Sequence, residues 1–296
     1  NGAFGTRPAA FQTVRYSEKL LQAAGITVVP IDLSEIFAQA QALDSSAAAV
    51  KNKLAAIKDY GRIPKEIAPE AIVKQAKLSV VLDRLMEENE LDASAIQCWN
   101  SVENNYGCAA CLSMSMMGQC YMPSACEMDV TGVISMYTLL LAGGNIPALL
   151  DWNNNYGNQR DMCVCTHCSN YPKDFIGSEI EISNLDVLGT VLDRKNCFGA
   201  VKGKAVPGPM TFFRLSTDDT KGRIKSYLGE GVFTNDPFGM DGGIAVCKVN
   251  NLRQLLRYIC QNGYEHHVGM ARGLSARVIY EAVSNYMKWD IYYHNG

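Results

Sequence analysis

The stretch SACEMDVTGVISMYTLLLAGGNIPALLDWNN, residues 124–154, places two carboxylates, Glu127 and Asp151, at the borders of apolar segments. The run Cys126–Ala142 is apolar on all sides of a helical projection, which predicts a helix inside the protein. Residues 146–152, IPALLDW, have the length and composition of a buried strand that ends close to Asp151. A buried helix followed by a buried strand is typical of a parallel sheet covered by helices.

The rest of the first half shows the same alternation of strands and helices. Strands are predicted at residues 2–5, 26–32 and 94–99, and helices at 14–24, 33–43, 47–60 and 70–90, with Ser34 as a candidate N-cap and Pro69 at a helix start. This pattern predicts an α/β class with a Rossmann-like parallel-sheet domain over residues 1–150.

The second half has a different pattern, from about residue 160 onward. Its runs are short, rich in β-branched residues and separated by turn signals, as in TFFRLS, GRIKSYLGEG and GGIAVCKV. We therefore predict a mostly antiparallel β-barrel domain over residues 151–296, with a sandwich as the alternative. Helices are expected at about 252–262 and 274–287.

The composition limits the classes of function. The chain has 296 residues, 48% of them hydrophobic, which suits about two domains with real cores. A net charge of −3 gives no electrostatic reason to expect nucleic acid or an anionic membrane as a partner. The apolar run Val133–Ala142 is shorter than the roughly 20 residues that cross a bilayer. The chain starts with NGAFGTRPAAF, which resembles the end of a strand, so an upstream portion is expected to be missing.

Eleven cysteines, an odd number scattered among apolar residues, are typical of reduced thiols in a cytoplasmic protein. The run MCVCTHC, residues 162–168, could form a zinc knuckle together with Cys108 and Cys111. We favour the other interpretation, a strand with buried thiols. His167 is then expected to be a core histidine, or one that supports a metal ligand, rather than a ligand itself.

The two carboxylates are candidates for a shared site. Ligands of open parallel sheets lie outside the carboxyl ends of the strands, where Asp151 is expected, and Glu127 is expected in the first turn of its helix. The segment GYEHHVGM adds His266 and His267, and two carboxylates with an imidazole suit a divalent cation. Asp129 points about 200° around the helix from Glu127 and is interpreted as structural. The alternatives are that Glu127 only caps its helix and that both histidines lie on the surface.

Five segments carry a resemblance to a known family: FGTRPAAF, LLQAAGITVVPIDLSEI, SACEMDVTG, LLDWNNNYG and GYEHHVGMARG. They resemble the L-fucose isomerase-like ketol isomerases, which are related to L-arabinose isomerase. The resemblance extends from the first residue to the last. It implies that the chain comprises the second, Rossmann-like domain and the C-terminal barrel domain of a three-domain protein.

The resemblance also implies a site. In that family a Glu, an Asp and a His bind manganese or a similar divalent metal, and the motifs place them at Glu127, Asp151 and His267. Three further residues are expected to contact the sugar: Gln97, Tyr227 and His266. The implied function is a metal-dependent aldose–ketose isomerase acting on L-fucose- or L-arabinose-like sugars through an enediol. Glu127 and Asp151 would be the catalytic acid and base, in an order that the motifs leave open.

Two other functions remain as alternatives. The first is a non-catalytic sugar- or metal-binding module, because in this family the first domain of a neighbouring subunit helps to close the active site. The second is a redox or zinc protein built on Cys163, Cys165 and Cys168. The family also implies a homo-oligomer whose partner is a small-molecule sugar, and the reduced cysteines imply the cytoplasm.

Overall fold

The computed structural model describes residues 1–177 and 179–295 and contains two sheets. The first sheet has four parallel strands in the order β2-β1-β3-β4. Its strands are β1 (Gly2–Phe4), β2 (Val29–Ile31), β3 (Ser94–Ile96) and β4 (Ser124–Ala125). The predicted parallel sheet is confirmed, with β1, β2 and β3 shorter than their predicted ranges and β4 not predicted. The strand predicted at residues 146–152 is not part of this sheet: as β5 (Ala148–Tyr156) it pairs antiparallel in the second sheet, so the prediction that Asp151 lies at the carboxyl end of a parallel strand is wrong.

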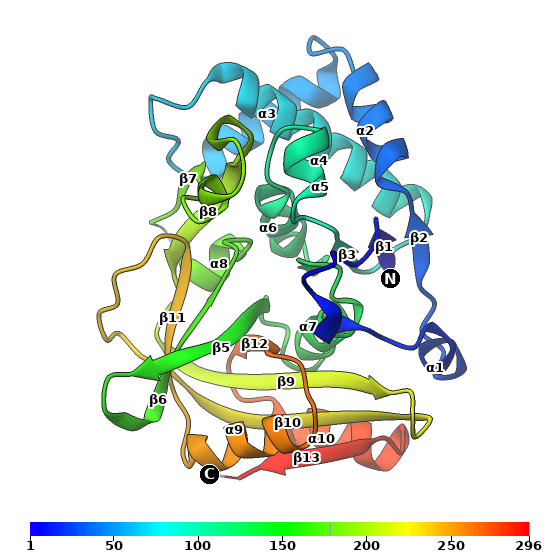
Figure 1. The fold of residues 1–296 in the computed structure, drawn as a ribbon, viewed down its shortest axis with the longest axis vertical. Coiled ribbons are helices and arrows are strands. Elements are labelled where there is room, and N and C mark those ends of the chain that lie inside the picture. The colour runs from blue at the N-terminus through cyan, green and yellow to red at the C-terminus, as the bar shows by residue number, and fades with distance from the viewer. Residues whose placement is uncertain (178, 296) are drawn as a thin grey trace.

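Helices surround this sheet, and those between β2 and β3 form one end of the molecule (Figure 1). They are η1 (Gln12–Val14), α1 (Glu18–Ala23), α2 (Leu33–Ala42), α3 (Ala48–Tyr60), α4 (Pro69–Glu88), α5 (Ser101–Asn105), α6 (Cys111–Gln119) and α7 (Val130–Gly143). Pro69 starts α4, because its fixed φ suits the first turn of a helix. Asp32 caps α2 in place of the predicted Ser34, whose backbone N–H it accepts. Within the described residues, none of the helices combines the length and the apolar character that crossing a bilayer requires.

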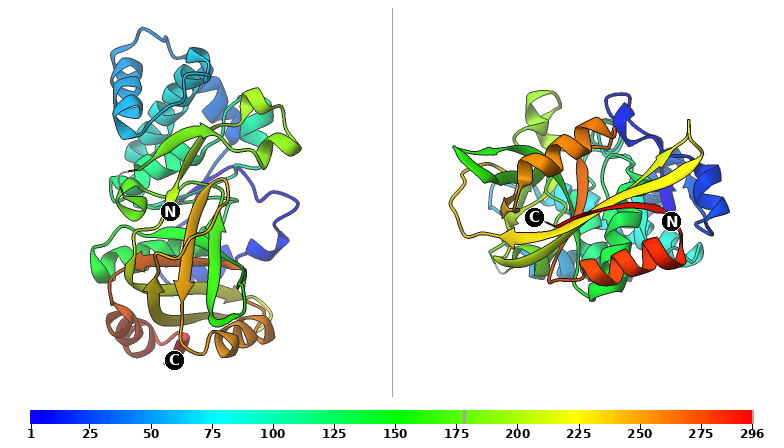
Figure 2. Two further views of the ribbon diagram at one scale, coloured as in Figure 1. Left: turned by 90° about the vertical axis from the view of Figure 1, so that its left-hand side faces the viewer. Right: turned by 90° about the horizontal axis from the view of Figure 1, so that it is seen from below.

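Most of the second sheet lies at the other end of the molecule (Figure 2, left), whereas its edge formed by residues 181–204 lies beside the helices of the first sheet (Figure 1). It has nine strands in the order β13-β10-β9-β12-β5-β6-β11-β8-β7. These are β5 (Ala148–Tyr156), β6 (Gln159–His167), β7 (Glu181–Asn184), β8 (Phe198–Lys204), β9 (Gly208–Asp218), β10 (Arg223–Phe233), β11 (Gly243–Lys248), β12 (His267–Arg272) and β13 (Asp290–His294). The remaining helices are α8 (Lys173–Ile176), η2 (Leu188–Thr190), η3 (Arg194–Asn196), α9 (Leu252–Gln261), α10 (Ala276–Tyr280) and the π-helix η4 (Glu281–Tyr286).

The pairings within this sheet are mostly antiparallel, as predicted. They run from β10 through β9, β12, β5, β6 and β11, and β11 pairs again with β10. Such a ring of pairings is what a barrel requires, and the barrel itself stays a prediction. The predicted domain boundary at residue 150 falls inside β5 and also stays a prediction, since α7 contacts both β9 and β12.

One glycine sets how closely α7 approaches the second sheet. A Cβ atom at Gly269 on β12 would lie 3.2 Å from the carbonyl oxygen of Phe213 and 3.3 Å from the backbone nitrogen of Met136. A larger residue would therefore push helix and strand apart. Because β12 begins at His267, this contact brings His267 close to the start of α7.

A buried carboxyl group lies on α5, the helix that follows β3. Glu103 is 1% exposed, and its Oε2 has no hydrogen-bond partner within the described chain. Burial raises the pKa of Glu103 to about 8. This burial indicates a structural position for Glu103.

Stability should consequently fall as the pH rises past the ordinary pKa of Glu103. The raised pKa means that the folded chain holds one more proton than the unfolded chain between about pH 4.5 and pH 8, so unfolding becomes easier as pH increases through that window. We expect Glu103→Gln to be more stable than the unmodified chain at pH 8, by on the order of 3 kcal/mol, and to lose that advantage near pH 4. Urea unfolding at both pH values measures the difference. The exposed Glu87→Gln is the control, and an advantage of equal size at both pH values would contradict the prediction.

Candidate metal centre and active site

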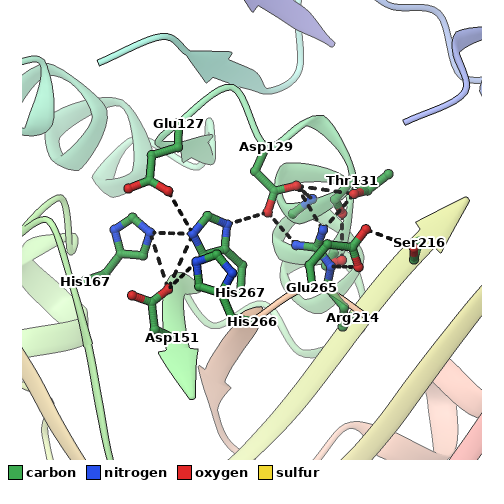
Figure 3. Close-up of polar contacts among 12 residues, drawn as sticks. Glu127, Asp129, Thr131, Asp151, His167, Arg214, Ser216, Glu265, His266 and His267 are labelled. Atoms are coloured by element: carbon green, nitrogen blue, oxygen red, sulfur yellow. Dashed lines mark hydrogen bonds and ion pairs between the residues drawn. The ribbon is translucent and has the colours of Figure 1, made fainter. Parts of the chain in front are cut away.

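Side chains from separate elements meet at one point between the two sheets (Figure 3). The loop between β4 and α7 supplies Glu127, and β5 supplies Asp151. His167 ends β6, and His267 begins β12. Asp151 and His267 are directly opposite each other on antiparallel strands, so their side chains leave the sheet on the same face.

The loop that carries Glu127 differs from the sequence prediction. The helix predicted from Cys126 begins only at Val130, because Glu127 and Met128 have φ values of 60° and 62°. Two adjacent left-handed residues cannot continue a helix, and each costs about 1–2 kcal/mol in a residue with a side chain. The prediction that Glu127 lies in the first helical turn is therefore wrong. Asp129 is the N-cap instead, and its Oδ1 accepts the backbone N–H of Gly132 at 2.8 Å.

The Nε2 atom of His267 is the centre of the cluster. It lies 3.1 Å from Oε2 of Glu127, 3.4 Å from Oδ1 of Asp151 and 3.3 Å from Nε2 of His167. Neither of these two carboxylate oxygens has a hydrogen-bond partner in residues 1–177 and 179–295, and both atoms are buried. Buried acceptors without a donor are rare, and two of them facing one imidazole nitrogen mark a position suited to a cation.

The other nitrogen of His267 determines how the ring can act. Its Nδ1 lies 2.8 Å from Oδ2 of Asp129 and donates a proton to that carboxylate. In the neutral ring the lone pair is then on Nε2, which faces Glu127 and Asp151. A carboxylate that holds a histidine in this way is typical of metal sites. The sequence analysis interpreted Asp129 as structural, and in the structure it also orients the imidazole ring of His267.

Asp129 is held in place by a buried arginine. Nη2 of Arg214 donates to Oδ1 of Asp129 at 3.0 Å, and Nε of Arg214 donates to Glu265 at 3.2 Å. The hydroxyl of Ser216 donates to the other Glu265 oxygen at 2.9 Å. Burial raises the pKa of Asp129, but Arg214 and His267 outweigh it and hold that pKa well below its usual range. Asp129 is therefore held in its ionised form, which accepts hydrogen bonds.

Arg214 and Glu265 were not identified from the sequence as part of a site. The available signal was the single charged residue in the apolar run FFRLS, residues 212–216. A fully buried arginine needs acidic partners, so this run pointed to a buried ion pair somewhere in the fold.

The charges of the cluster show how a proton and a metal would compete. Burial lowers the pKa of His267, but the close contacts with the carboxylates of Asp129 and Glu127 raise it to about 10. Burial likewise raises the pKa of Glu127, and the contacts with His267 and His167 bring it below the ordinary value. The doubly protonated imidazole of His267 thus supplies the positive charge between the carboxylates. A divalent cation would have to displace one of its protons.

His167 has a different orientation from His267. Its Nδ1 accepts the backbone N–H of Cys168 at 2.8 Å, so the neutral ring carries its proton on Nε2. This Nε2 faces His267 and lies 3.9 Å from Oδ1 of Asp151. In that state His167 offers a donor rather than a lone pair, as expected of a residue that supports ligands. The thiol of Cys168 donates to Oε1 of Glu127 at 3.4 Å.

His266 lies on the open side of the cluster. Its side chain is 42% exposed, and its Nε2 lies 3.8 Å from Oδ1 of Asp151. The neighbouring His267 is fully buried. The two histidines therefore lie in different environments. His267 faces the carboxylates inside the protein, and His266 is on the side that is open to solvent.

Gln97 follows β3 at the carboxyl edge of the first sheet. Its Oε1 accepts the backbone N–H of Thr6 at 2.8 Å, and its Nε2 donates to Ser101 at 3.0 Å. It lines a cavity of about 640 Å³ together with residues that follow β1 and β2, among them Gly5 and Asp32. Both ends of the Gln97 amide are thus hydrogen-bonded to protein groups, and the side chain borders an open cavity.

Tyr227 on β10 has no exposed surface. Its hydroxyl accepts the indole N–H of Trp152 at 3.0 Å, and its ring packs edge-on against Tyr264. A direct contact between Tyr227 and a sugar would therefore require these groups to rearrange.

The cysteine-rich run does not form a single knuckle. The predicted strand is confirmed as β6, and two separate groups result. Cys163 and Cys165 lie with Cys247, whereas Cys168 lies with Cys126 and His167. Among the residues that the structure describes, neither group includes Cys108 or Cys111.

Comparison with known proteins identifies one matching family and relatives that cover most of this chain. Residues 165–294 match the family described as L-fucose isomerase, C-terminal domain. Sulfoquinovose isomerases from Priestia aryabhattai and Priestia megaterium (strain ATCC 12872 / QMB1551) are each 27% identical over 276 residues, which is 90% of this chain and 58% of the relative. The sulfoquinovose isomerase of Alkalicoccus urumqiensis is 25% identical over 197 residues, 65% of this chain and 42% of the relative.

These matches confirm the resemblance to the L-fucose isomerase-like family that the motifs indicate. The chain spans 58% of the length of the two Priestia relatives.

Proposed function

We propose that this chain, as a relative of the L-fucose isomerase-like proteins, carries the metal centre of an aldose–ketose isomerase. The observation that carries the proposal is the convergence of Glu127 and Asp151, each with a buried oxygen lacking a hydrogen-bond partner in the described chain, on Nε2 of His267. The family match and the curated sugar isomerases support it. We further propose that the ring of strand pairings in the second sheet is a closed barrel, as in the expected C-terminal domain.

Glu127, Asp151 and His267 would hold Mn²⁺ or a similar divalent cation. Carboxylate oxygens and an imidazole nitrogen are the donor types that such cations use, and three protein ligands leave coordination positions for the substrate. When bound, the ion would polarise the sugar oxygens and stabilise negative charge that develops on them.

The two carboxylates would move the proton. In an aldose–ketose isomerisation, a base removes the proton from C2 of the open-chain sugar, an enediol forms, and the proton is returned at C1. Glu127 and Asp151 together supply the acid and the base. The Asp151 side chain is 22% exposed and that of Glu127 is 5% exposed, so Asp151 is the more accessible to a sugar. His266 and Gln97 would contact the sugar hydroxyls.

The sugar is proposed as a class. The resemblance points to L-fucose- or L-arabinose-like aldoses, and the curated relatives are named for sulfoquinovose. We also propose a homo-oligomer in the cytoplasm. All eleven cysteines are free thiols, which suits a reducing compartment.

A non-catalytic sugar- or metal-binding module is the second candidate. It is favoured by the coverage of the Priestia relatives, of which the chain spans 58%. In that case the carboxylates and His267 would bind a metal and a sugar without turning the sugar over.

A panel of aldoses tests the proposal on the full-length gene product. L-fucose, L-arabinose and sulfoquinovose are offered after treatment with a chelator, with and without added Mn²⁺. We expect ketose formation from at least one sugar and only with the added metal, because the cation has to stabilise the enediol oxygens. Metal binding without turnover of any aldose would support the second candidate instead.

A further inference from the structure

A second group of metal-ligating atoms lies inside the second sheet, between β6 and β11. Cys163 and Cys247 are directly opposite each other on these antiparallel strands. Cys165 is two residues along β6 and therefore faces the same side of the sheet as Cys163. The Sγ atoms of all three lie within 4.8 Å of one another. Strand register, and not the local sequence alone, brings them together.

The spacing of the sulfur atoms already matches that around a bound metal. A metal–thiolate bond is about 2.3 Å long, which puts two sulfurs on one ion about 3.8–4.0 Å apart. The Sγ atoms of Cys163 and Cys165 are 3.7 Å apart. An ion could therefore be held by these two sulfurs with little movement of the strand, and the Sγ atom of Cys247 lies within 4.8 Å of both.

The surroundings contain an orphaned polar group. Tyr171 is fully buried, and its hydroxyl has no hydrogen-bond partner in the described residues. Burial raises the pKa of Tyr171. Its ring lies against Gly243 at the start of β11, the strand that also carries Cys247. Buried hydroxyl groups without a partner are rare.

We propose that Cys163, Cys165 and Cys247 form a structural site for a soft monovalent cation of the Cu(I) type. Thiolate ligands select Cu(I) or zinc among common cellular metals. Zinc in structural sites takes four ligands, and this group offers three within the described chain. Each cysteine that binds the ion does so as a thiolate, and its proton leaves with solvent.

The site is chemically distinct from the cluster around His267. That cluster has oxygen and nitrogen donors for a hard or borderline divalent ion, whereas this one has only sulfur. The proposal therefore stands or fails independently of the isomerase function.

Copper binding by the full chain tests the site. The chain is refolded without oxygen, with Cu(I) supplied as a complex with a competing chelator, because the thiols are buried in the folded state. We expect one bound ion fewer per chain in Cys163→Ala and in Cys247→Ala than in the unmodified chain. The melting temperature should rise with copper in the unmodified chain, and this rise should shrink in both variants.

Controls separate this site from the other thiols. Cys120→Ala and Cys260→Ala remove exposed thiols and should keep the full ion count. Cys168→Ala removes a thiol of the other cysteine group and reports any ion bound there. An unchanged ion count in folded Cys163→Ala and Cys247→Ala would overturn the proposal.

A spectroscopic measurement avoids the risk that a variant fails to fold. X-ray absorption at the copper edge, on folded Cys168→Ala loaded with a single ion, should show a first shell of three sulfurs. A shell that contains nitrogen or oxygen would overturn the assignment. So would stoichiometric zinc uptake at these thiols in the presence of the competing copper complex.

Discussion

Glu127→Gln is expected to lower kcat for the sugar by about a thousandfold or more, together with loss of most bound manganese. The amide has nearly the shape of the carboxylate but cannot take up a proton, and it is a weaker ligand for a divalent cation. Oε2 of Glu127 faces His267 without a hydrogen-bond partner in the described chain, so no other group there can replace it. Steady-state kinetics with metal analysis of the purified variant give both quantities.

Glu103→Gln is the matched control for this experiment. It also removes a buried carboxyl group in the same half of the chain, but Glu103 lies on α5 outside the cluster and should leave turnover and metal content unchanged. Turnover by Glu127→Gln within tenfold of the unmodified chain would argue against the proposed centre. Zinc that is retained by Glu127→Gln and lost from Cys165→Ala would favour the cysteine-based alternative.

Asp129→Asn should weaken manganese binding by about 10- to 100-fold, although Asp129 is not a proposed ligand. Its carboxylate accepts the proton on Nδ1 of His267. An asparagine can instead present its NH₂ group, which favours the tautomer with the proton on Nε2 and blocks the lone pair needed by the metal. Removing one partner of a buried ion pair should also cost about 3–5 kcal/mol of unfolding free energy. Calorimetric titration with Mn²⁺ and urea unfolding measure the two effects.

Glu265→Gln separates these two effects. Both acids pair with Arg214, but no contact between Glu265 and His267 appears among the described hydrogen bonds and ion pairs. We expect Glu265→Gln to lose a similar amount of stability and to keep its affinity for manganese. Equal losses of affinity in both variants would show that Asp129 acts through the stability of the fold and not through the imidazole.

The sequence predicts the parts of the fold that depend on local signals. The helices α3 and α4 have a clear apolar periodicity, and Pro69 marks the start of α4. The short helix α6 was missed because nearly all its residues are buried, so it shows no polar face that would reveal a helical period. The start of α7 was placed too early because the left-handed pair Glu127 and Met128 has no glycine to signal it.

The composition of the centre was predictable from motifs, but its support was not. Glu127, Asp151 and His267 stand out because they are polar residues in or beside apolar runs. Arg214 is 85 residues from Asp129 and 51 residues from Glu265 in sequence, and only the pairing of β9 with β12 brings these elements together. Strand order and register are long-range properties, which single-sequence patterns do not encode.

The pairing of β5 with β12 has a consequence for how the protein can vary. Ala148 to Asp151 pair with β12 in continuous register, whereas the pairing of β5 with β6 is irregular beyond Trp152. An inserted or deleted residue after Trp152 can be absorbed by these bulges, but one before Asp151 would turn its side chain to the opposite face. Relatives that keep the centre should therefore differ in length at the far end of the β5–β6 hairpin and hardly at all between Ala148 and Asp151.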